Sequence, residues 1–285
     1  MLLILGGGFV AADIQAIRRN YFSAADHIFK VKRIIALSPA ITELVFSAGA
    51  GTKLVGVSRF SDFPSAARTI PEIGDAYDLD LERIIELRPD LIIIWKQGNT
   101  DKNIDQLVQL GMQLLEVDIK NLDEIPDLVR IIGKLAGTED YAELAANQYE
   151  DRLFQIKQNY GNKTKINVLQ LIWLQPLITF GKNHLINEIF RICGGESAIN
   201  THQGNTYFLD TENFLAANPD VILDSTASEL AASGMHDFLK KYSLMHAVKN
   251  EHIFFISPDL ILRETLRILD AIQIVCDYLD EVRKK

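Results

Sequence analysis

The stretch "LDLERIIELRPDLII" (residues 79–93) predicts a short helix that ends near a proline and leads into a buried strand. Two of its acidic residues, Asp80 and Glu82, fall at the start of the helix, where the helix dipole favours carboxylates. Farther along, the chain reads "LDTENFLAANPDVIL" (residues 209–223), with the same order of helix, proline and strand. The repeat indicates an architecture that occurs twice, with one glutamate, Glu82 or Glu212, in each helix.

Apolar runs on both sides of the two copies predict strands that alternate with helices. This alternation is typical of βαβ units, which build parallel sheets. The sequence therefore predicts an α/β fold of two Rossmann-like lobes, each a small parallel sheet wrapped in helices, with a ligand cleft between the lobes. The predicted strands are residues 32–38, 53–58, 90–95, 112–118, 166–174, 220–225 and 252–257.

A long uninterrupted helix is expected to join the lobes. Residues 138–161 contain no glycine or proline before Gly161, and Thr138 is a suitable N-cap. Such a helix is a rigid rod of roughly 30 Å; the alternative is a surface helix that packs on one lobe only. The expected division is an N-terminal segment 1–31, a first lobe 32–137, the linking helix 138–161 and a second lobe 162–285.

The composition argues against two classes of protein. Of the 285 residues 48% are hydrophobic, and the formal net charge is −9. An acidic chain lacks the clustered lysines and arginines of a nucleic-acid-binding protein. No apolar run reaches the roughly 18–20 residues that span a bilayer. The sequence predicts a soluble globular protein that does not bind nucleic acid.

The N-terminus and the cysteines bear on the cellular compartment. Residues 1–12, "MLLILGGGFVAA", match the apolar part of a secretory signal without its basic leader; a short apolar helix or strand start is the alternative. Cys193 and Cys276 are either two small buried side chains or, in an exported protein, a disulfide. Neither lies in a CxxC or CxxH motif, so a zinc or iron–sulfur site is not expected.

Aromatic residues gather in the loops that follow the predicted strands and in the segments before the two repeated helices. Open α/β sheets bind ligands at the carboxyl ends of their strands. Aromatic faces there suit a large, flat, partly apolar ligand, although some of these rings would instead cap the lobe cores. Arg59, Arg263 and Arg267 would bind an anionic group; Arg267 alternatively faces solvent or pairs with an acid. The aromatic residues are Phe60, Phe63, Tyr77, Trp95, Phe180, Tyr207 and Phe208.

Motifs for catalysis are missing from the sequence. It contains no GxxxxGK[ST], GxSxG or HExxH, and no GxGxxG between a strand and a helix. The six histidines are scattered without an HxH or HxxxH pair. We therefore expect no catalytic residues, no metal site and no cofactor. An enzyme or metal-cluster protein on a similar fold would need more converging cysteine or histidine ligands than two cysteines supply.

Several segments resemble a known family: "RIIALSPAITELVFSAG", "LVGVSRFSDFP", "LDLERIIELRPDLIIIWKQGN", "QLGMQLLEVD" and "GKNHLINEIFRICGG". They are similar to the periplasmic vitamin B12-binding proteins of ABC importers, within the helical-backbone (class III) group that binds metal chelates. The resemblance implies a soluble, monomeric periplasmic receptor that captures cobalamin or a related corrinoid and delivers it to a membrane permease. An iron siderophore or haem is the alternative ligand, because the wider group binds both.

The resemblance also implies roles for individual residues. Trp95 matches a cleft tryptophan, Phe60 stands for a cleft tyrosine and Ile178 for a phenylalanine. Ala76 and Thr206 stand where the family has tryptophans, and Tyr77 and Tyr207 lie one residue along. These departures bear on affinity and on the choice of corrinoid. Arg263 is a further ligand-binding candidate.

The remaining implied roles concern the disulfide and the partner protein. The cysteine pair matches the family's disulfide, which implies a Cys193–Cys276 bond. Glu82 and Glu212 match the glutamates that dock to arginines of the permease. The alternative is that each glutamate only complements its helix dipole.

Overall fold

The computed structural model of the chain describes residues 30–284 except 97, 162, 200–201 and 227–231. The expected signal segment, residues 1–12, lies outside them. The chain divides into two compact units, and two of the boundaries between them fall within helices α1 (Pro39–Ser47) and α4 (Glu124–Ala136). The first unit takes in the described residues up to 42, with 52–118 and 135–137; the second takes in 43–51, 119–134 and the described residues from 138 onward.

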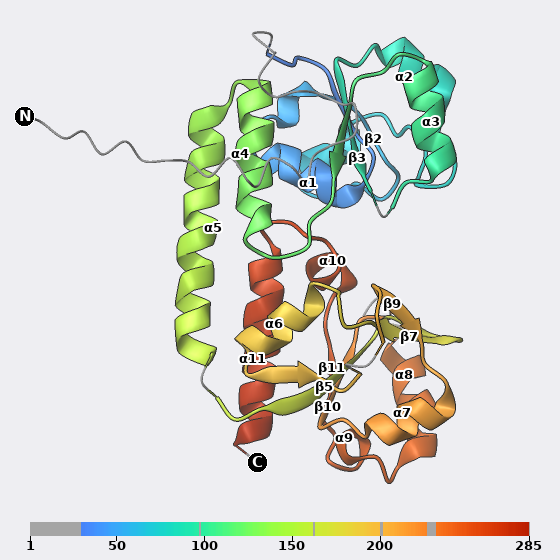
Figure 1. Cartoon of the computed structure of the whole chain (residues 1–285), viewed down its shortest axis with the longest axis vertical. Helices are drawn as coiled ribbons and strands as arrows, with labels where there is room; N and C mark the ends of the chain where they lie inside the picture. The colour runs from blue at the N-terminus through green and yellow to red at the C-terminus, as the bar shows by residue number, and fades with distance from the viewer. Residues whose placement is uncertain (1–29, 97, 162, 200–201, 227–231, 285) are drawn as a thin grey trace, which may run out of the picture. The chain divides into compact units, whose positions relative to one another are not determined.

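The first unit is built on a parallel sheet with the strand order β2-β1-β3-β4. Ile35 and Ile92 on one face of this sheet pack with Ile84 of α2 and Leu107 of α3 into one buried cluster; Figure 1 shows α2 and α3 together on that side. The elements that begin in this unit are β1 (Ile34–Ala36), α1 (Pro39–Ser47), β2 (Leu54–Val57), a 3-10 turn (Ser65–Thr69), α2 (Leu81–Leu87), β3 (Leu91–Trp95), α3 (Asp101–Gln109) and β4 (Leu114–Val117).

The second unit has its own parallel sheet, with the order β11-β10-β5-β8. Leu169, Leu171 and Ile222 of this sheet pack against Phe214 of α7 and Met235 of α8, while α6 and α11 lie on the other side of the strands (Figure 1). Its elements are β5 (Ile166–Leu171), α6 (Ile186–Ile192), β8 (Gly195–Ser197), α7 (Thr211–Ala217), β10 (Val221–Asp224), α8 (Ala232–Leu239), α9 (His246–Lys249), β11 (Ile253–Phe255), α10 (Pro258–Ile261) and α11 (Ile268–Arg283).

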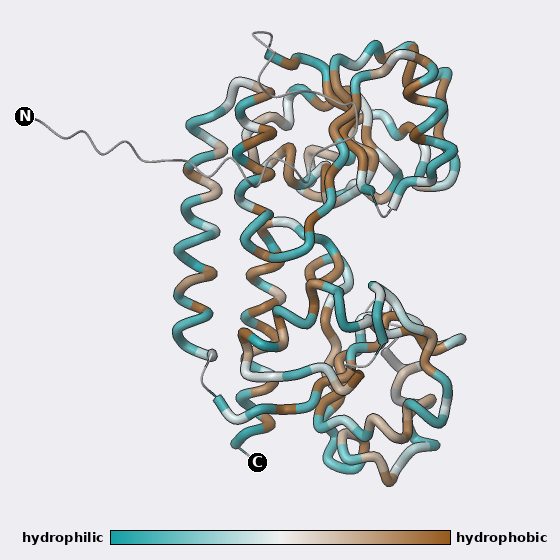
Figure 2. Tube along the Cα trace, in the orientation of Figure 1, coloured by the Kyte–Doolittle hydropathy of each residue, from teal (hydrophilic) through white to brown (hydrophobic). Residues whose placement is uncertain are grey.

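These two sheets confirm the predicted α/β fold with parallel strands in two lobes. Figure 2 shows why the sequence carried that signal, because the central strands are drawn in the brown of hydrophobic residues. Strands that are buried on both faces read as near-continuous apolar runs.

One predicted strand is wrong at its end. Residues 166–174 were expected to form a single strand, but β5 ends at Leu171 and a new strand, β6 (Trp173–Leu174), begins in another sheet. The chain turns back at Gln175–Pro176, where proline lacks the N–H that a continuing ladder would need. The resulting antiparallel sheet, of order β6-β7-β9, adds β7 (Leu177–Phe180) and β9 (Thr206–Phe208) and was not expected from the sequence.

The long helix is present as α5 (Glu139–Tyr160), and α4 (Glu124–Ala136) precedes it. Thr138 does not cap α5 with its side chain; its hydroxyl donates instead to the Ala48 carbonyl oxygen at 2.6 Å. Arg130 of α4 holds the two helices together, with Nη1 lying 2.6 Å from the Glu150 carboxylate. All of α5 belongs to the second unit.

Candidate functional site

Three of the predicted ligand-binding residues lie at the carboxyl ends of the first unit's strands. Trp95 is the last residue of β3, Phe60 lies in the turn after β2, and Tyr77 lies in the segment before α2. The side chains of Phe60 and Tyr77 are largely exposed, and Trp95 is half-buried. This edge is where open α/β sheets bind ligands.

A polar network joins the turn of Phe60 to the turn of Tyr77. The Arg59 guanidinium lies 2.9 Å from the Asp75 carboxylate, and Arg59 N–H donates to the Gly74 carbonyl oxygen at 2.7 Å. Asp75 also accepts the backbone N–H groups of Tyr77 at 3.0 Å and Asp78 at 3.1 Å. The Tyr77 and Asp78 N–H groups, followed by Arg59, lower the pKa of Asp75 below its ordinary value. An ionised Asp75 therefore holds both aromatic-bearing turns.

The backbone of Phe60 is in the left-handed region, with φ of +67°. This region is unfavourable for a bulky residue, so the surroundings must impose it. Buried hydroxyls flank the turn: Thr42 Oγ1 donates to Ser61 Oγ at 3.0 Å, and Ser58 Oγ lies 3.3 Å from Ser61 Oγ. These buried hydrogen bonds fix the turn, while the Phe60 ring stays exposed.

Asn99 fixes the turn that follows Trp95. Its side-chain oxygen accepts the Trp95 N–H at 2.9 Å, and its own N–H donates to the Trp95 carbonyl oxygen at 3.0 Å. Four residues later, Asn103 Nδ2 donates to the Ala76 carbonyl oxygen at 2.9 Å. The segments that carry Trp95 and Tyr77 are therefore linked through the start of α3.

In the second unit, Ile178 lies in the middle of an aromatic row. It pairs with Trp173 on one neighbouring strand and with Phe208 on the other, and directly paired residues project from the same face of a sheet. Trp173 and Phe208 are both more than half exposed. The sequence prediction missed Trp173, because it placed this residue inside a strand and not in a loop at a strand end. The signal that would have found it is the "WLQPLI" hairpin, in which the proline turn pairs Trp173 with Ile178.

Tyr207 and Phe180 lie elsewhere. Tyr207 pairs with Thr179 and so projects from the opposite face to Ile178 and Phe208. Its ring stacks on His202 at a centroid distance of 3.6 Å and packs against the buried cluster. Phe180 is buried against His184. The structure brings Phe208, rather than Tyr207, together with Ile178.

Arg263 lies in a compact charge cluster. Its Nη1 is 3.0 Å from Glu43 Oε1 and its Nη2 is 2.6 Å from Asp259 Oδ1. Arg267 contacts the same Glu43 carboxylate through Nε at 2.8 Å and Nη2 at 2.6 Å, and Thr265 donates its hydroxyl to Glu43 as well. Glu43 is almost completely buried, so the arginines compensate its charge. The positive charge of these arginines is therefore directed at carboxylates of the protein.

Glu82 and Glu212 occupy matching places on α2 and α7. Each is exposed in the first turn of its helix, two residues after the N-cap. The caps are Asp80, which accepts the Arg83 N–H at 2.9 Å, and Asp210, which accepts the Asn213 N–H at 2.7 Å. Both glutamate side chains are accessible to a partner.

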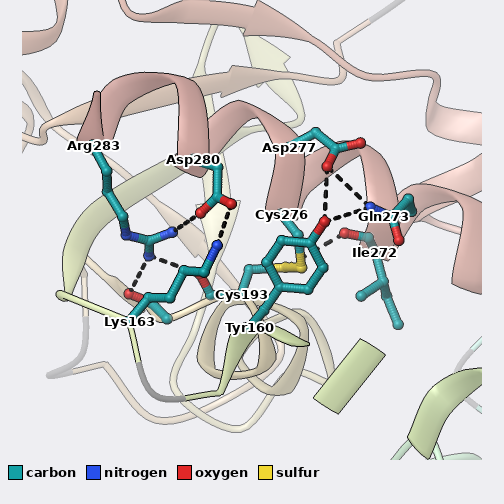
Figure 3. Close-up of a disulfide and its surroundings, with 10 residues drawn as sticks. Tyr160, Lys163, Cys193, Ile272, Gln273, Cys276, Asp277, Asp280 and Arg283 are labelled. Carbon is teal, nitrogen blue, oxygen red and sulfur yellow. Dashed lines mark hydrogen bonds and ion pairs between the residues drawn. A yellow bond between two sulfur atoms is a disulfide. The ribbon is translucent and has the colours of Figure 1, made fainter. Parts of the chain in front are cut away.

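The disulfide implied by the resemblance is present. It joins Cys193, at the end of α6, to Cys276 of α11, and both residues are fully buried. Figure 3 shows polar contacts on both sides of the bond. On one side Arg283 Nη2 donates to the Cys193 carbonyl oxygen at 2.8 Å, and on the other the Tyr160 hydroxyl donates to Asp277 at 2.9 Å. The bond lies wholly within the second unit.

None of the helices in the described residues is both long and apolar enough to cross a membrane. No group of three or more histidine, cysteine, aspartate or glutamate side chains in that part of the chain is arranged to hold a metal ion.

Comparison with known proteins agrees with this architecture. The family model described as "Periplasmic binding protein" matches residues 34–260. The chain belongs to this family. It is 31% identical over 257 residues to the vitamin B12-binding protein of Vibrio cholerae serotype O1, covering 90% of this chain and 92% of the relative. It is 29% identical over 255 residues to that of Salmonella paratyphi A, with coverages of 90% and 92%.

Solved structures give the same result. The crystal structure of the periplasmic vitamin B12 binding protein of Vibrio cholerae matches with a TM-score of 0.84 at 31% identity, covering 90% of this chain and 100% of that one. The haem-binding protein BhuT matches with a TM-score of 0.78 at 20% identity, covering 88% and 98%. At that identity the second match supports the fold alone.

Proposed function

We propose that this protein captures cobalamin or a related corrinoid and delivers it to the permease of an ABC importer. The observation that carries the proposal is the 31% identity to a vitamin B12-binding protein, which extends over 90% of the chain and is matched by a TM-score of 0.84 to a solved structure of that kind. Binding and release are then the whole function, without catalysis or a cofactor.

Aromatic residues that are exposed or half-buried support a large, flat ligand. Phe60, Tyr77 and Trp95 at the strand ends of the first unit offer ring faces, and Trp173 and Phe208 do so in the second. Ring faces suit a corrin macrocycle because each covers a wide apolar area. We propose that Trp173 and Phe208 supply aromatic surface beside Ile178, where the resemblance implied a phenylalanine.

The charge arrangement favours a corrinoid over an anionic siderophore or haem. Arg59 faces Asp75, Arg263 faces Glu43 and Asp259, and Arg267 faces Glu43. A guanidinium that already contacts a carboxylate gains little from a second anion, since the local charge is compensated. An anionic ligand would have to displace these contacts.

The same proposal covers location and partner. It takes residues 1–12 as part of an export signal, and it places the monomeric protein in the periplasm. The exposed carboxylates of Glu82 and Glu212 would dock to arginines on the permease, one on each subunit of a two-fold symmetric dimer. Exposed ion pairs of this kind mainly steer and orient a complex.

Calorimetric titration of the purified protein tests the ligand. We expect saturable one-to-one binding of cyanocobalamin with nanomolar to low-micromolar affinity, and no saturation with haemin or a ferric siderophore. Replacing Trp95 with alanine should weaken binding about ten-fold or more, because a buried aromatic contact is lost. The matched control Phe154→Ala, an exposed aromatic on α5, should leave affinity unchanged. Saturation by haemin without any heat from cyanocobalamin would refute the proposal.

A further inference from the structure

The two repeated helices share more than a glutamate. Positions 82–88 and 212–218 follow the same order of exposed, buried and half-buried residues. At the third position of each series Ile84 or Phe214 is fully buried and anchors its helix to the unit's core. The helices therefore present the same face to solvent in both units.

Each of these faces carries a large aliphatic side chain that the core does not use. Ile85 is 47% exposed on α2, and Leu215 is 50% exposed on α7. Each lies three residues after its glutamate, and residues at that spacing are neighbours on one helix face. An exposed carboxylate and an exposed aliphatic group are thus adjacent in both units.

Other exposed positions of the two helices carry different residues. Arg83 corresponds to Asn213 and Glu86 to Ala216. On α2 the Arg83 guanidinium pairs with Glu86 at 2.9 Å, an interaction that α7 cannot make. The two helices therefore differ in local charge but agree in the carboxylate and the aliphatic group. A single exposed aliphatic residue needs no explanation, but two at matching positions beside matching carboxylates do.

We infer that Glu82 with Ile85 and Glu212 with Leu215 form two equivalent contact pairs for one partner, the importer permease. This inference rests on the proposed function and adds the chemistry of the partner. Each permease subunit would present a basic side chain with an apolar pocket about one helical turn away. The carboxylate orients the complex, and burial of the aliphatic group slows its dissociation.

Binding to the importer measures the two contributions separately. The cobalamin-loaded protein is passed over the importer complex of the same organism, held in nanodiscs, and association and dissociation rates are recorded at several salt concentrations. We expect Ile85→Ala with Leu215→Ala to weaken binding at least ten-fold through faster dissociation, with its salt dependence intact. Glu82→Lys with Glu212→Lys should slow association and block cobalamin uptake without changing cobalamin affinity.

The matched control is Val108→Ala with Leu144→Ala, two exposed aliphatic residues on α3 and α5. Normal binding by this control supports the inference, and an equal loss overturns it. Unchanged dissociation of the Ile85/Leu215 variant, while the glutamate variant still fails to dock, refutes the apolar contact and leaves the proposed docking intact. Normal uptake by the glutamate variant refutes the docking proposal itself. A change in self-association, rather than importer binding, would assign the face to a second copy of the chain and overturn the inference.

Discussion

The helix–strand pairs α2–β3 and α7–β10 have the same local structure in the two units. Each helix begins at an aspartate cap and ends at a left-handed residue, Arg88 with φ of +44° or Asn218 with φ of +33°. After the shared proline, Asp90 accepts the Lys32 and Arg33 N–H groups, and Asp220 accepts the Asn167 N–H. The carboxylates tie each returning chain to the neighbouring strand.

The supports around these matching pairs differ between the units. In the first unit the aromatic-bearing turns are held by polar contacts such as Arg59–Asp75. The second unit adds a separate antiparallel sheet for its aromatic row and a disulfide between α6 and α11. The local sequence therefore determines the helix–strand geometry, whereas the candidate site depends on stabilising contacts that differ between the two units.

Removing the disulfide should produce the largest difference between the units. Replacing Cys193 and Cys276 with alanine frees a loop whose ends are 83 residues apart in sequence. Loss of such a bond destabilises a protein by about 2–5 kcal/mol. Hydrogen exchange with peptide resolution should show faster exchange in β10 and β5, with β3 much less affected.

The wild-type protein under reducing conditions provides the matched comparison for this variant. It should show the same selective loss of protection in the second unit. An equal loss of protection in β3 and β10 would mean that the two units unfold together. The disulfide would then not stabilise the second unit selectively.

Most of the fold could be predicted because its signals are local. Buried strands such as β3 are continuous apolar runs, and helix α2, which precedes β3, has its own N-cap and C-terminal stop residue. The antiparallel sheet escaped prediction because β6 has only two residues and follows β5 after a single intervening residue. An apolar run does not reveal such a change of sheet.

The candidate site was less predictable because it depends on contacts between distant residues. The aromatic residues at strand ends, such as Trp95, follow from the strand pattern. Which ring lies beside Ile178 follows from strand register, and register placed Phe208 there instead of Tyr207. The pairing of Arg263 with Glu43 spans 220 residues, so no local pattern could indicate it.

The unfolding free energy should also depend on pH through His184, which lies in the second unit. Burial lowers the pKa of His184 from 6.5 to about 4, and its Nδ1 accepts the Ile186 N–H at 3.1 Å. The unfolded chain therefore binds a proton more readily. The stability that His184 contributes is therefore present above pH 6.5 and is lost as the pH falls toward 4. Between pH 7 and pH 5 the loss should be about 2 kcal/mol.

Urea unfolding of wild type and His184→Phe at both pH values checks this prediction. Phenylalanine retains stacking on Phe180 but cannot titrate, so the variant should lose less stability on acidification. His202→Phe is the matched control, because that histidine also stacks on an aromatic ring, that of Tyr207. Identical pH dependence in wild type and His184→Phe would contradict the assignment.

The N-caps of α2 and α7 can be compared directly, and their removal should change stability least. Asp80→Ala and Asp210→Ala should each destabilise the local helix by about 1 kcal/mol, the usual contribution of an N-cap. Asp210 should cost more, because it accepts both the backbone N–H and the side-chain Nδ2 of Asn213, whereas Asp80 accepts only the Arg83 N–H as a cap. Hydrogen exchange in α2 and α7 measures each loss in its own helix. The asparagine variants, which retain a side-chain acceptor, should recover most of the protection. A larger loss in α2 than in α7 would show that the surroundings, and not the cap contacts, set the stability of these helices.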